Sequence, residues 1–262
     1  MTTWMMGGVS AVVVILAATG LFFFLVTRGA LMWRAFSGAQ SDDSHVYPIY
    51  SNMRLIKMID FQPIISAILL FQYKRLVSTI ISELDLLELR EKKVLITSCA
   101  FGNVIPRVVK AVVQGGAERV LIVDILRNEL IRAETKVQEF NGKVEFIEDD
   151  ATALKCESDE VAANVIFFLL HELPDHQKGQ ALIEAGRVLA PGGRLLIAEF
   201  HRPDPWVLRA LSWTYFKVFE PLGLAIWDTH DPLCWLENAG GWNCARTTYF
   251  FGNFQIITAT KL

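Results

Sequence analysis

The ten residues VLITSCAFGN, at positions 94–103, decide the fold of this 262-residue chain. An apolar strand runs directly into small residues, as in α/β sheets whose first loop binds a nucleotide cofactor. The usual loop has an acidic residue followed by three alternating glycines, but here those positions are Ile96, Ser98, Ala100 and Gly102. Glycine permits a positive φ and a close approach of backbone to ligand. The loop therefore predicts an altered cofactor seat, with Ser98, Ala100 and Gly102 as its contacts.

Strand-like and helix-like segments alternate downstream of this loop. Short apolar runs predict strands, and longer segments with helical periodicity separate them. The predicted strands are 94–97, 120–124, 144–147, 164–170 and 194–200, and the helices between them are 104–113, 126–140 and 177–189. This alternation predicts a doubly wound α/β sheet. Residues 247–251 and 254–260, on either side of Gly252-Asn253, predict a C-terminal β-hairpin.

The first residues predict a membrane anchor. Positions 2–27 carry no charged side chain, and a helix of roughly 20 apolar residues crosses the hydrocarbon of a bilayer. A cleaved signal peptide is the alternative, but it has a basic start and a shorter apolar core. Arg28 and Arg34 follow the stretch and no basic side chain precedes it. We therefore expect a single-pass transmembrane helix within residues 1–35, with the rest of the chain in the cytoplasm.

The remaining residues predict a linker and one domain. Residues 36–62 begin with small and polar residues typical of a linker, and residues 63–262 are long enough for one substantial domain. Pro63 opens a predicted helix that runs to about Leu87. Its apolar first part, residues 64–71, either covers the sheet or forms a lip that touches lipid or admits an apolar substrate. Aromatic residues over 206–219 either line a substrate tunnel or pack a helix on the sheet.

Composition narrows the function. The net charge of −3 gives no reason to expect a nucleic-acid partner. A hydrophobic fraction of 52% is high for a soluble enzyme. The four cysteines have no C-x-x-C spacing, which in a cytoplasmic domain indicates reduced thiols.

Two carboxylates stand at the ends of predicted strands. Asp124 ends the second strand, where a carboxylate accepts both ribose hydroxyls of a nucleoside; the alternative is a surface residue that caps the next helix. Asp150 follows the third strand, where it either binds the adenine amino group or lies in a solvated loop. Because ligands bind beyond the carboxyl ends of such strands, we expect both to contact the cofactor.

Several longer pieces carry a family resemblance. They are FFLLHE at 167–172, FHRP at 200–203, FEPLGLAIW at 219–227 and TYFFGNFQ at 248–255. With the altered loop and the helix over 62–86, they resemble the rhodoquinone biosynthesis protein (RquA) family across residues 46–262. The resemblance implies a class I methyltransferase-like Rossmann sheet, with which the turn at Pro191-Gly192-Gly193 agrees. The N-terminal membrane helix departs from the family.

The resemblance also implies an activity. Proteins of this family convert ubiquinone to rhodoquinone, replacing a ring methoxy group by an amino group. S-adenosylmethionine (SAM) is implied as the amino donor, with Mn²⁺ as the metal and a ubiquinone-type lipid as the substrate. The alternative is a SAM-dependent methyltransferase that acts on a quinone or another membrane lipid. A third possibility is an inactive scaffold in a quinone-synthesis assembly.

Polar residues after the fourth and fifth strands are the predicted catalytic groups. His171 and Glu172 follow the fourth strand, while Glu199 and His201 end the fifth at a spacing that places both on one side. Carboxylate and imidazole suit Mn²⁺, so we expect His171, Glu199 and His201 to bind metal. His171, Glu172 and His201 are also expected to take part in catalysis. The alternative for each histidine is a hydrogen-bonded structural residue. Tyr249 either donates a hydrogen bond to a quinone oxygen or belongs to the core.

Overall fold

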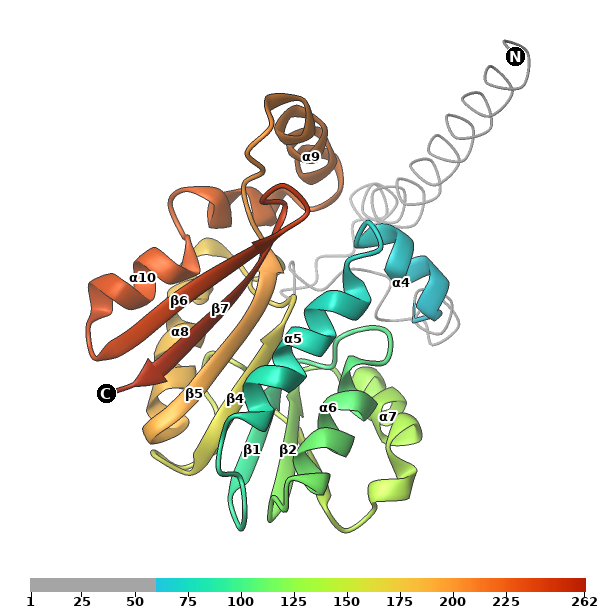
Figure 1. Cartoon of the computed structure of the whole chain (residues 1–262), viewed down its shortest axis with the longest axis vertical. Coiled ribbons are helices and arrows are strands. Elements are labelled where there is room, and N and C mark those ends of the chain that lie inside the picture. Colours follow the sequence, from blue (N-terminus) through green and yellow to red (C-terminus); the bar gives the residue numbers. More distant parts are fainter. Residues whose placement is uncertain (1–59) are drawn as a thin grey trace, which may run out of the picture.

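Seven strands form one mixed sheet in the computed structural model, which describes residues 60–262 (Figure 1). Their order across the sheet is β3-β2-β1-β4-β5-β7-β6. β1 to β5 run parallel, and β7 pairs antiparallel with both β5 and β6. The predicted α/β sheet with a terminal hairpin is therefore confirmed. The strands are β1 (Lys93–Thr97), β2 (Arg119–Asp124), β3 (Val144–Glu148), β4 (Val161–Phe167), β5 (Leu189–Phe200), β6 (Trp242–Tyr249) and β7 (Phe254–Lys261).

Helices cover both faces of this sheet (Figure 1). α5, α6 and α7 lie on one face, and α8 and α10 on the other. Because both faces are covered, the central strands are continuous apolar runs rather than alternating ones; β4 is buried along almost its whole length. The helical elements are α4 (Gln62–Ile68), α5 (Tyr73–Asp85), α6 (Val104–Gln114), α7 (Arg127–Lys136), η3 (Gln138–Phe140), α8 (Asp175–Val188), α9 (Trp206–Phe219), η4 (Pro221–Trp227) and α10 (Pro232–Ala239).

The helix predicted from Pro63 to about Leu87 is two helices, so that prediction is wrong. α4 and α5 meet at 93°, and Leu70 and Phe71 between them adopt left-handed φ values of 49° and 60°. Neither residue is a glycine or a proline, so the sequence carries no local signal for the break. The bend allows α5 to pack on α6 while α4 turns over the carboxyl ends of the strands.

Two chain reversals near the site also differ from prediction. β4 ends at Phe167 rather than at residue 170, because Phe168 has a left-handed φ of 56° and leaves the strand. The hairpin turn spans residues 250–253 rather than Gly252-Asn253 alone, and Phe250 and Phe251 have φ values of 47° and 54°. Both changes place aromatic side chains in conformations that non-glycine residues rarely adopt.

The predicted transmembrane helix lies outside the described residues, as does most of the predicted linker. Over residues 60–262, no single helix has both the length and the apolar character needed to cross a bilayer. α4 and α5 meet that test only as a bent pair.

Candidate active site

A cavity of about 220 Å³ opens at the carboxyl ends of the parallel strands. The loops after β1, β2, β3 and β4 line it, together with α4 and the region of α9. This is the edge where ligands bind in open α/β sheets. Six of the predicted site residues line this one cavity, namely Ser98, Ala100, Asp124, Asp150, His171 and Glu172.

The loop after β1 keeps the backbone shape of a glycine loop without its first glycine. Ser98 has a φ of 80°, in the region where a side chain costs about 1–2 kcal/mol. Its N–H donates to the carbonyl of Val123 at 2.8 Å, which ties the loop to the end of β2. The left-handed turn expected of a glycine is therefore present at Ser98, and the strain is stored beside the cavity.

Gly102 retains glycine for two physical reasons. Its φ is 83°, and a Cβ at this position would lie 2.5 Å from the hydroxyl oxygen of Tyr73. The Gly102 N–H donates to the Asp60 carboxylate at 2.7 Å, and Arg132 and Lys136 form ion pairs with the same carboxylate. Gly102 thus holds the loop against the start of the described chain and does not itself line the cavity.

Asp124 lies where the sequence predicts a ribose-binding carboxylate. It accepts hydrogen bonds from the backbone N–H groups of Cys99, at 2.7 Å, and Leu126, at 2.8 Å. Burial raises the pKa of this carboxyl, while these hydrogen bonds oppose the shift. Each oxygen has accepted one bond, and a carboxylate has about four acceptor sites. Asp124 can therefore also accept two hydroxyl groups from a ligand in the cavity.

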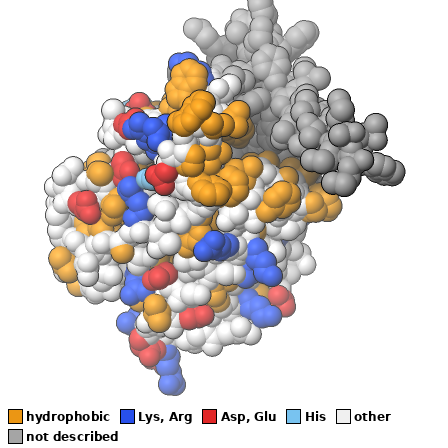
Figure 2. Space-filling view, turned by 45° about the horizontal axis from the view of Figure 1, so that its top comes forward, with side chains coloured by type: hydrophobic (Ala, Val, Ile, Leu, Met, Phe, Trp, Pro, Cys, Tyr) orange, Lys and Arg blue, Asp and Glu red, His pale blue; other side chains and the backbone are white. Residues whose placement is uncertain are grey.

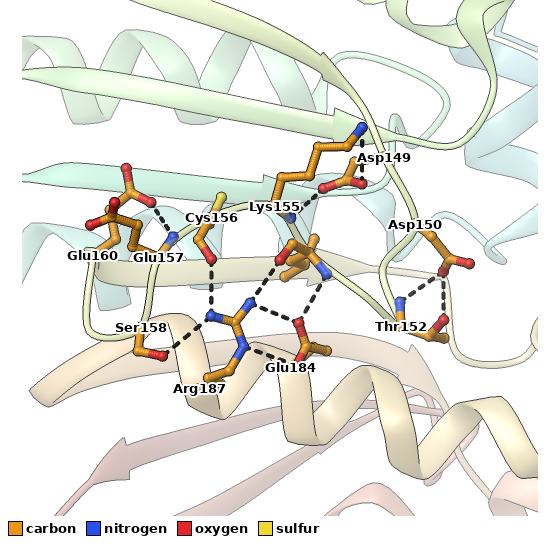
Figure 3. Close-up of polar contacts among 11 residues, drawn as sticks. Asp149, Asp150, Thr152, Lys155, Cys156, Glu157, Ser158, Glu160, Glu184 and Arg187 are labelled. Atoms are coloured by element: carbon orange, nitrogen blue, oxygen red, sulfur yellow. Dashed lines mark hydrogen bonds and ion pairs between the residues drawn. The ribbon is translucent and has the colours of Figure 1, made fainter.

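The loop after β3 is fixed by its own polar contacts (Figure 3). Asp150 accepts bonds from the N–H and hydroxyl of Thr152, both at 2.8 Å. Asp149 accepts from the N–H of Lys155 at 2.6 Å. On the far side, Arg187 pairs with Glu184 at 2.8 Å and donates to carbonyls of the loop. The loop is therefore preorganised, and both aspartates line the cavity.

Glu129 lines the cavity and was not predicted from the sequence. It is 4% exposed, and its Oε1 atom has no hydrogen-bond partner among the described residues. Burial, aided by the nearby charge of Asp124, raises the pKa of this carboxyl to about 8. A signal existed: Glu129 precedes the buried Ala133 and Val137 at helical spacing, so it shares their inward face.

His171 and Glu199 form a buried ion pair at the other end of the cavity. The Nδ1 atom of His171 lies 3.0 Å from a Glu199 oxygen, and the His171 N–H donates to the same carboxylate at 3.2 Å. Burial alone lowers the pKa of His171, but the Glu199 carboxylate outweighs it and, with Glu172 and Glu220, raises the pKa to about 9. His171 therefore carries a positive charge at neutral pH, with its Nε2 4.0 Å from Glu172.

Aromatic rings surround this pair. The Phe200 ring meets the His171 ring edge-on, with 5.0 Å between the ring centroids, and the centroids of the Phe168 and Phe200 rings are 4.9 Å apart. Phe216 and Trp227 extend the cluster. The rings supply the apolar part of this end of the cavity, which Glu172 and Glu220 also line beside the charged imidazole. A flat ring that carries an oxygen fits such a mixture of apolar walls and a few polar groups.

The structure does not bring His201 or Tyr249 to this cavity. β5 ends at Phe200, so strand alternation no longer places His201 beside Glu199. Instead, the His201 ring contacts the Gly252 carbonyl at 2.7 Å and Arg246 at 3.2 Å. The Tyr249 hydroxyl bonds to Thr79 at 2.9 Å, between β6 and α5. Both positions correct the predicted catalytic set.

The predicted Mn²⁺ ligands are therefore not assembled. His171 and Glu199 bond to each other, while His201 faces the hairpin. Over residues 60–262, no three histidine, cysteine or carboxylate side chains are grouped so as to hold a metal ion. The residues present do not fit the metal as predicted.

Comparisons with known proteins agree with this architecture. Residues 50–241 match the ubiE/COQ5 methyltransferase family. The ubiquinone/menaquinone biosynthesis C-methyltransferase UbiE of Marinomonas sp. (strain MWYL1) is 32% identical over 128 residues, covering 48% of this chain and 50% of that protein. The demethylmenaquinone methyltransferase of Clavibacter sepedonicus is 39% identical over 81 residues, covering 31% and 32%. The chain spans about half the length, or less, of these curated relatives.

Solved structures share the fold at low sequence identity. A SAM-dependent methyltransferase from Aquifex aeolicus has a TM-score of 0.57 at 19% identity, covering 80% of this chain and 99% of that one. Magnesium protoporphyrin IX methyltransferase (ChlM) from Synechocystis PCC 6803, with bound SAH, has a TM-score of 0.52 at 17% identity, covering 93% and 99%. These likenesses establish the class I methyltransferase fold.

Proposed function

This chain belongs to the ubiE/COQ5 methyltransferase family, and we propose that it transfers a group from SAM to the ring of a lipid quinone. The observation that carries the proposal is the layout of a single cavity. One end presents the loop after β1 with Asp124, and the other presents a charged His171 among aromatic rings. The first end suits a nucleoside, and the second suits a flat ring with an oxygen substituent.

The residues at the polar end fit SAM. Asp124 has acceptor sites left for the ribose hydroxyls, and Asp150 lies on the fixed loop that would face the adenine. The unpartnered oxygen of Glu129 matches the cationic ammonium group of the cofactor. When bound, SAM supplies an activated methyl group and also carries a primary amine. Buried carboxylates that await a cation are the chemistry expected of such a seat.

His171 is the group we assign to the substrate. Glu199 fixes its Nδ1 side and keeps the imidazole charged, which leaves Nε2 to donate a hydrogen bond to an oxygen on the ring. Methylation of a reduced ring passes through a phenolate-like oxygen, and amine addition to an oxidised ring builds negative charge on the opposite carbonyl. A preorganised donor at that oxygen stabilises either charge.

Methyl transfer to a ring carbon is the reaction that the relatives support better. The Marinomonas relative is a C-methyltransferase of ubiquinone and menaquinone biosynthesis, and the Clavibacter relative is a demethylmenaquinone methyltransferase. The family match over residues 50–241 includes the loop after β1 and Asp124. We therefore place SAM-dependent methylation of a quinone ring first.

Ring amination is a second candidate, and the loop after β1 favours it. Ile96 is buried where the usual loop has an acidic residue, and Ser98 and Ala100 replace two glycines. A cofactor-binding loop altered at three positions can hold SAM in a different orientation, so that its amine rather than its methyl group faces the quinone ring. The resemblance to the rhodoquinone biosynthesis proteins, which stays a prediction, implies the same exchange of methoxy for amino.

One experiment separates these reactions. The full chain is expressed in bacteria that make ubiquinone, fed with methionine carrying heavy carbon in its methyl group or heavy nitrogen in its amino group. Quinones are then extracted and analysed by mass spectrometry. A quinone with one more heavy methyl group than the quinones of cells without the chain supports methylation, and an aminoquinone that gains heavy nitrogen supports amination.

The controls keep the proposal open to refutation. Asp124→Ala should abolish the new product, whereas Glu134→Gln, an exposed change on α7, should leave it unchanged. An unaltered quinone profile in cells that contain the folded chain would refute transfer to a quinone.

A further inference from the structure

Large apolar side chains are exposed on three elements at the end of the molecule where the cavity lies. α9 exposes Trp206 by 77% and Leu211 by 65%, and the hairpin turn exposes Phe251 by 67%. Phe71, between α4 and α5, is 79% exposed and Phe61 is 59% exposed. Figure 1 shows α4, α9 and the β6–β7 turn at one end, and Figure 2 shows hydrophobic side chains gathered there. We call these five residues the apolar face.

α9 and the hairpin turn form one unit within this face. The Asp204 N–H donates to the Phe251 carbonyl at 2.9 Å, and Ser212 donates to the Asn253 side chain at 2.7 Å. Phe251 is held in a left-handed conformation with its ring in solvent. Neither the strain nor the exposed ring stabilises the isolated domain, so the turn is arranged for a contact.

The charges on α9 favour an anionic partner. The helix carries Arg209 and Lys217 and no carboxylate. Apolar and aromatic residues beside cations, on a helix that lies at the surface, are the composition of a segment that lies in a membrane interface. Tryptophan is enriched at that depth because its ring is apolar and its N–H is polar.

The same elements line the cavity. Ile65 and Ile68 of α4 contribute to its wall, with Leu69 directly after that helix. Tyr215 of α9 and Glu220 directly after it also contribute. Phe61 of the apolar face is the residue directly before α4. Upstream of it lies the stretch 2–27, which carries no charge. An apolar face and a cavity lined by the same helices point to one kind of surface, and the uncharged stretch upstream in the sequence agrees with it.

We propose that the apolar face lies in the interface of a lipid bilayer that contains anionic lipid. α9 then lies along the headgroups, and the Phe251 turn and the Phe71 corner insert below them. A lipid quinone enters the cavity between α4 and α9 without moving its apolar tail through water. This last step rests on the proposed function, whereas the membrane contact does not.

The test uses tryptophan fluorescence of the full chain in vesicles of phosphatidylcholine and phosphatidylglycerol. Phospholipids with brominated acyl chains quench tryptophans that reach the membrane. We expect Trp206→Phe to lose a quenchable component of the emission. The control, Trp235→Phe on α10, removes a partly buried tryptophan outside the apolar face and should leave that component unchanged. No quinone or SAM is present, so the result is independent of the proposed reaction.

Two results would overturn the proposal. If Trp206→Phe leaves the quenchable emission unchanged, the face does not enter the bilayer. If sedimentation in detergent instead reveals a dimer that the Leu211→Ser/Phe251→Ser variant dissociates, the face binds a second copy of this chain. The thermal unfolding midpoint of both variants should match the parent, because the replaced side chains are exposed.

Discussion

The two ends of the cavity are held in different ways. We call the end with Asp124 and the loop after β1, where we propose that SAM binds, the cofactor end, and the end with His171, where we propose that the quinone ring binds, the ring end. At the cofactor end, backbone N–H groups of neighbouring loops fix Asp124, and the turn at Ser98 keeps its shape without glycine. At the ring end, His171 in the loop after β4 and Glu199 on β5 stabilise each other as opposite charges in a buried site. The backbone therefore protects the cofactor end from side-chain replacement, whereas the ring end depends on one ion pair.

Activity should be most sensitive to substitutions at the ring end. In Glu199→Gln, His171 loses the largest of the charges that raise its pKa, so burial is opposed only by Glu172 and Glu220 and the pKa falls. We expect activity at neutral pH to fall by about 10²-fold or more, as for loss of a positioned proton donor. The pH–activity profile should shift toward acid, and an NMR titration of the His171 ring should follow it. Glu172→Gln, which removes a more distant charge, should shift both much less.

The same ion pair makes stability depend on pH. The pKa of His171 in the folded protein, about 9, lies above the ordinary histidine value of 6.5. The contribution of the pair to stability is therefore complete below about pH 6.5 and is lost as the pH rises through about 9. Chemical denaturation across this range should show the loss in the parent and not in Glu199→Gln. A parent whose stability stays flat would contradict a charged His171.

The cofactor end should break next. Asp124→Ala removes the proposed acceptor for two ribose hydroxyls, and hydrogen bonds to charged groups contribute roughly 1.5–3 kcal/mol each. We expect SAM affinity, measured by calorimetry, to fall at least about tenfold. Because Asp124 also holds the Cys99 and Leu126 N–H groups, thermal unfolding must confirm that the variant is folded. Unchanged affinity in the folded variant would remove Asp124 from the cofactor site.

The sequence predicted the cofactor end well because its logic is local. Apolar runs predicted β1 and β2, and the carboxyl end of a strand is where a nucleoside carboxylate belongs. Ser98, Ala100, Asp124 and Asp150 all line the cavity, and their contact with the cofactor stays a prediction. Glu129 was missed although its helical spacing matched buried neighbours. A charged residue is rarely buried without a partner, and that expectation outweighed the pattern.

The ring end was predicted only in part because its contacts are between distant segments. His171 and Glu199 were named, but their pairing depends on how β4 ends, and the left-handed Phe168 that ends it carries no sequence signal. His201 was assigned by strand alternation, which stops when the strand stops at Phe200. The break between α4 and α5 was hidden for the same reason, since Leu70 and Phe71 are ordinary helix residues.

A pH titration of SAM binding sharpens the role of Glu129. Burial raises its pKa to about 8, and the charges around it are Asp124, Asp60 and Glu172, opposed by Lys136. A bound cation favours the ionised carboxylate, so SAM affinity should rise by about tenfold per pH unit up to about pH 8 and then level off. In Glu129→Gln that slope should vanish. An equal slope in both proteins would mean that another group takes the cofactor's positive charge.

The smallest effect tests whether the backbone alone carries the shape of the loop. Ser98 has a φ of 80°, whereas Ala100 is not among the residues with positive φ. Ser98→Gly removes the cost of about 1–2 kcal/mol that a side chain has in the left-handed conformation. It also increases the conformational entropy of the unfolded chain, which lowers the free energy of unfolding by about 0.4–1 kcal/mol. We therefore expect a net gain of roughly 0.5–1 kcal/mol, or about 1–4 °C in Tm. Ala100→Gly has only the second effect and should lower Tm.

Because glycine adopts the same turn, SAM affinity in Ser98→Gly should stay near that of the parent. A lower Tm in Ser98→Gly would mean that the serine side chain, and not the backbone, holds this loop.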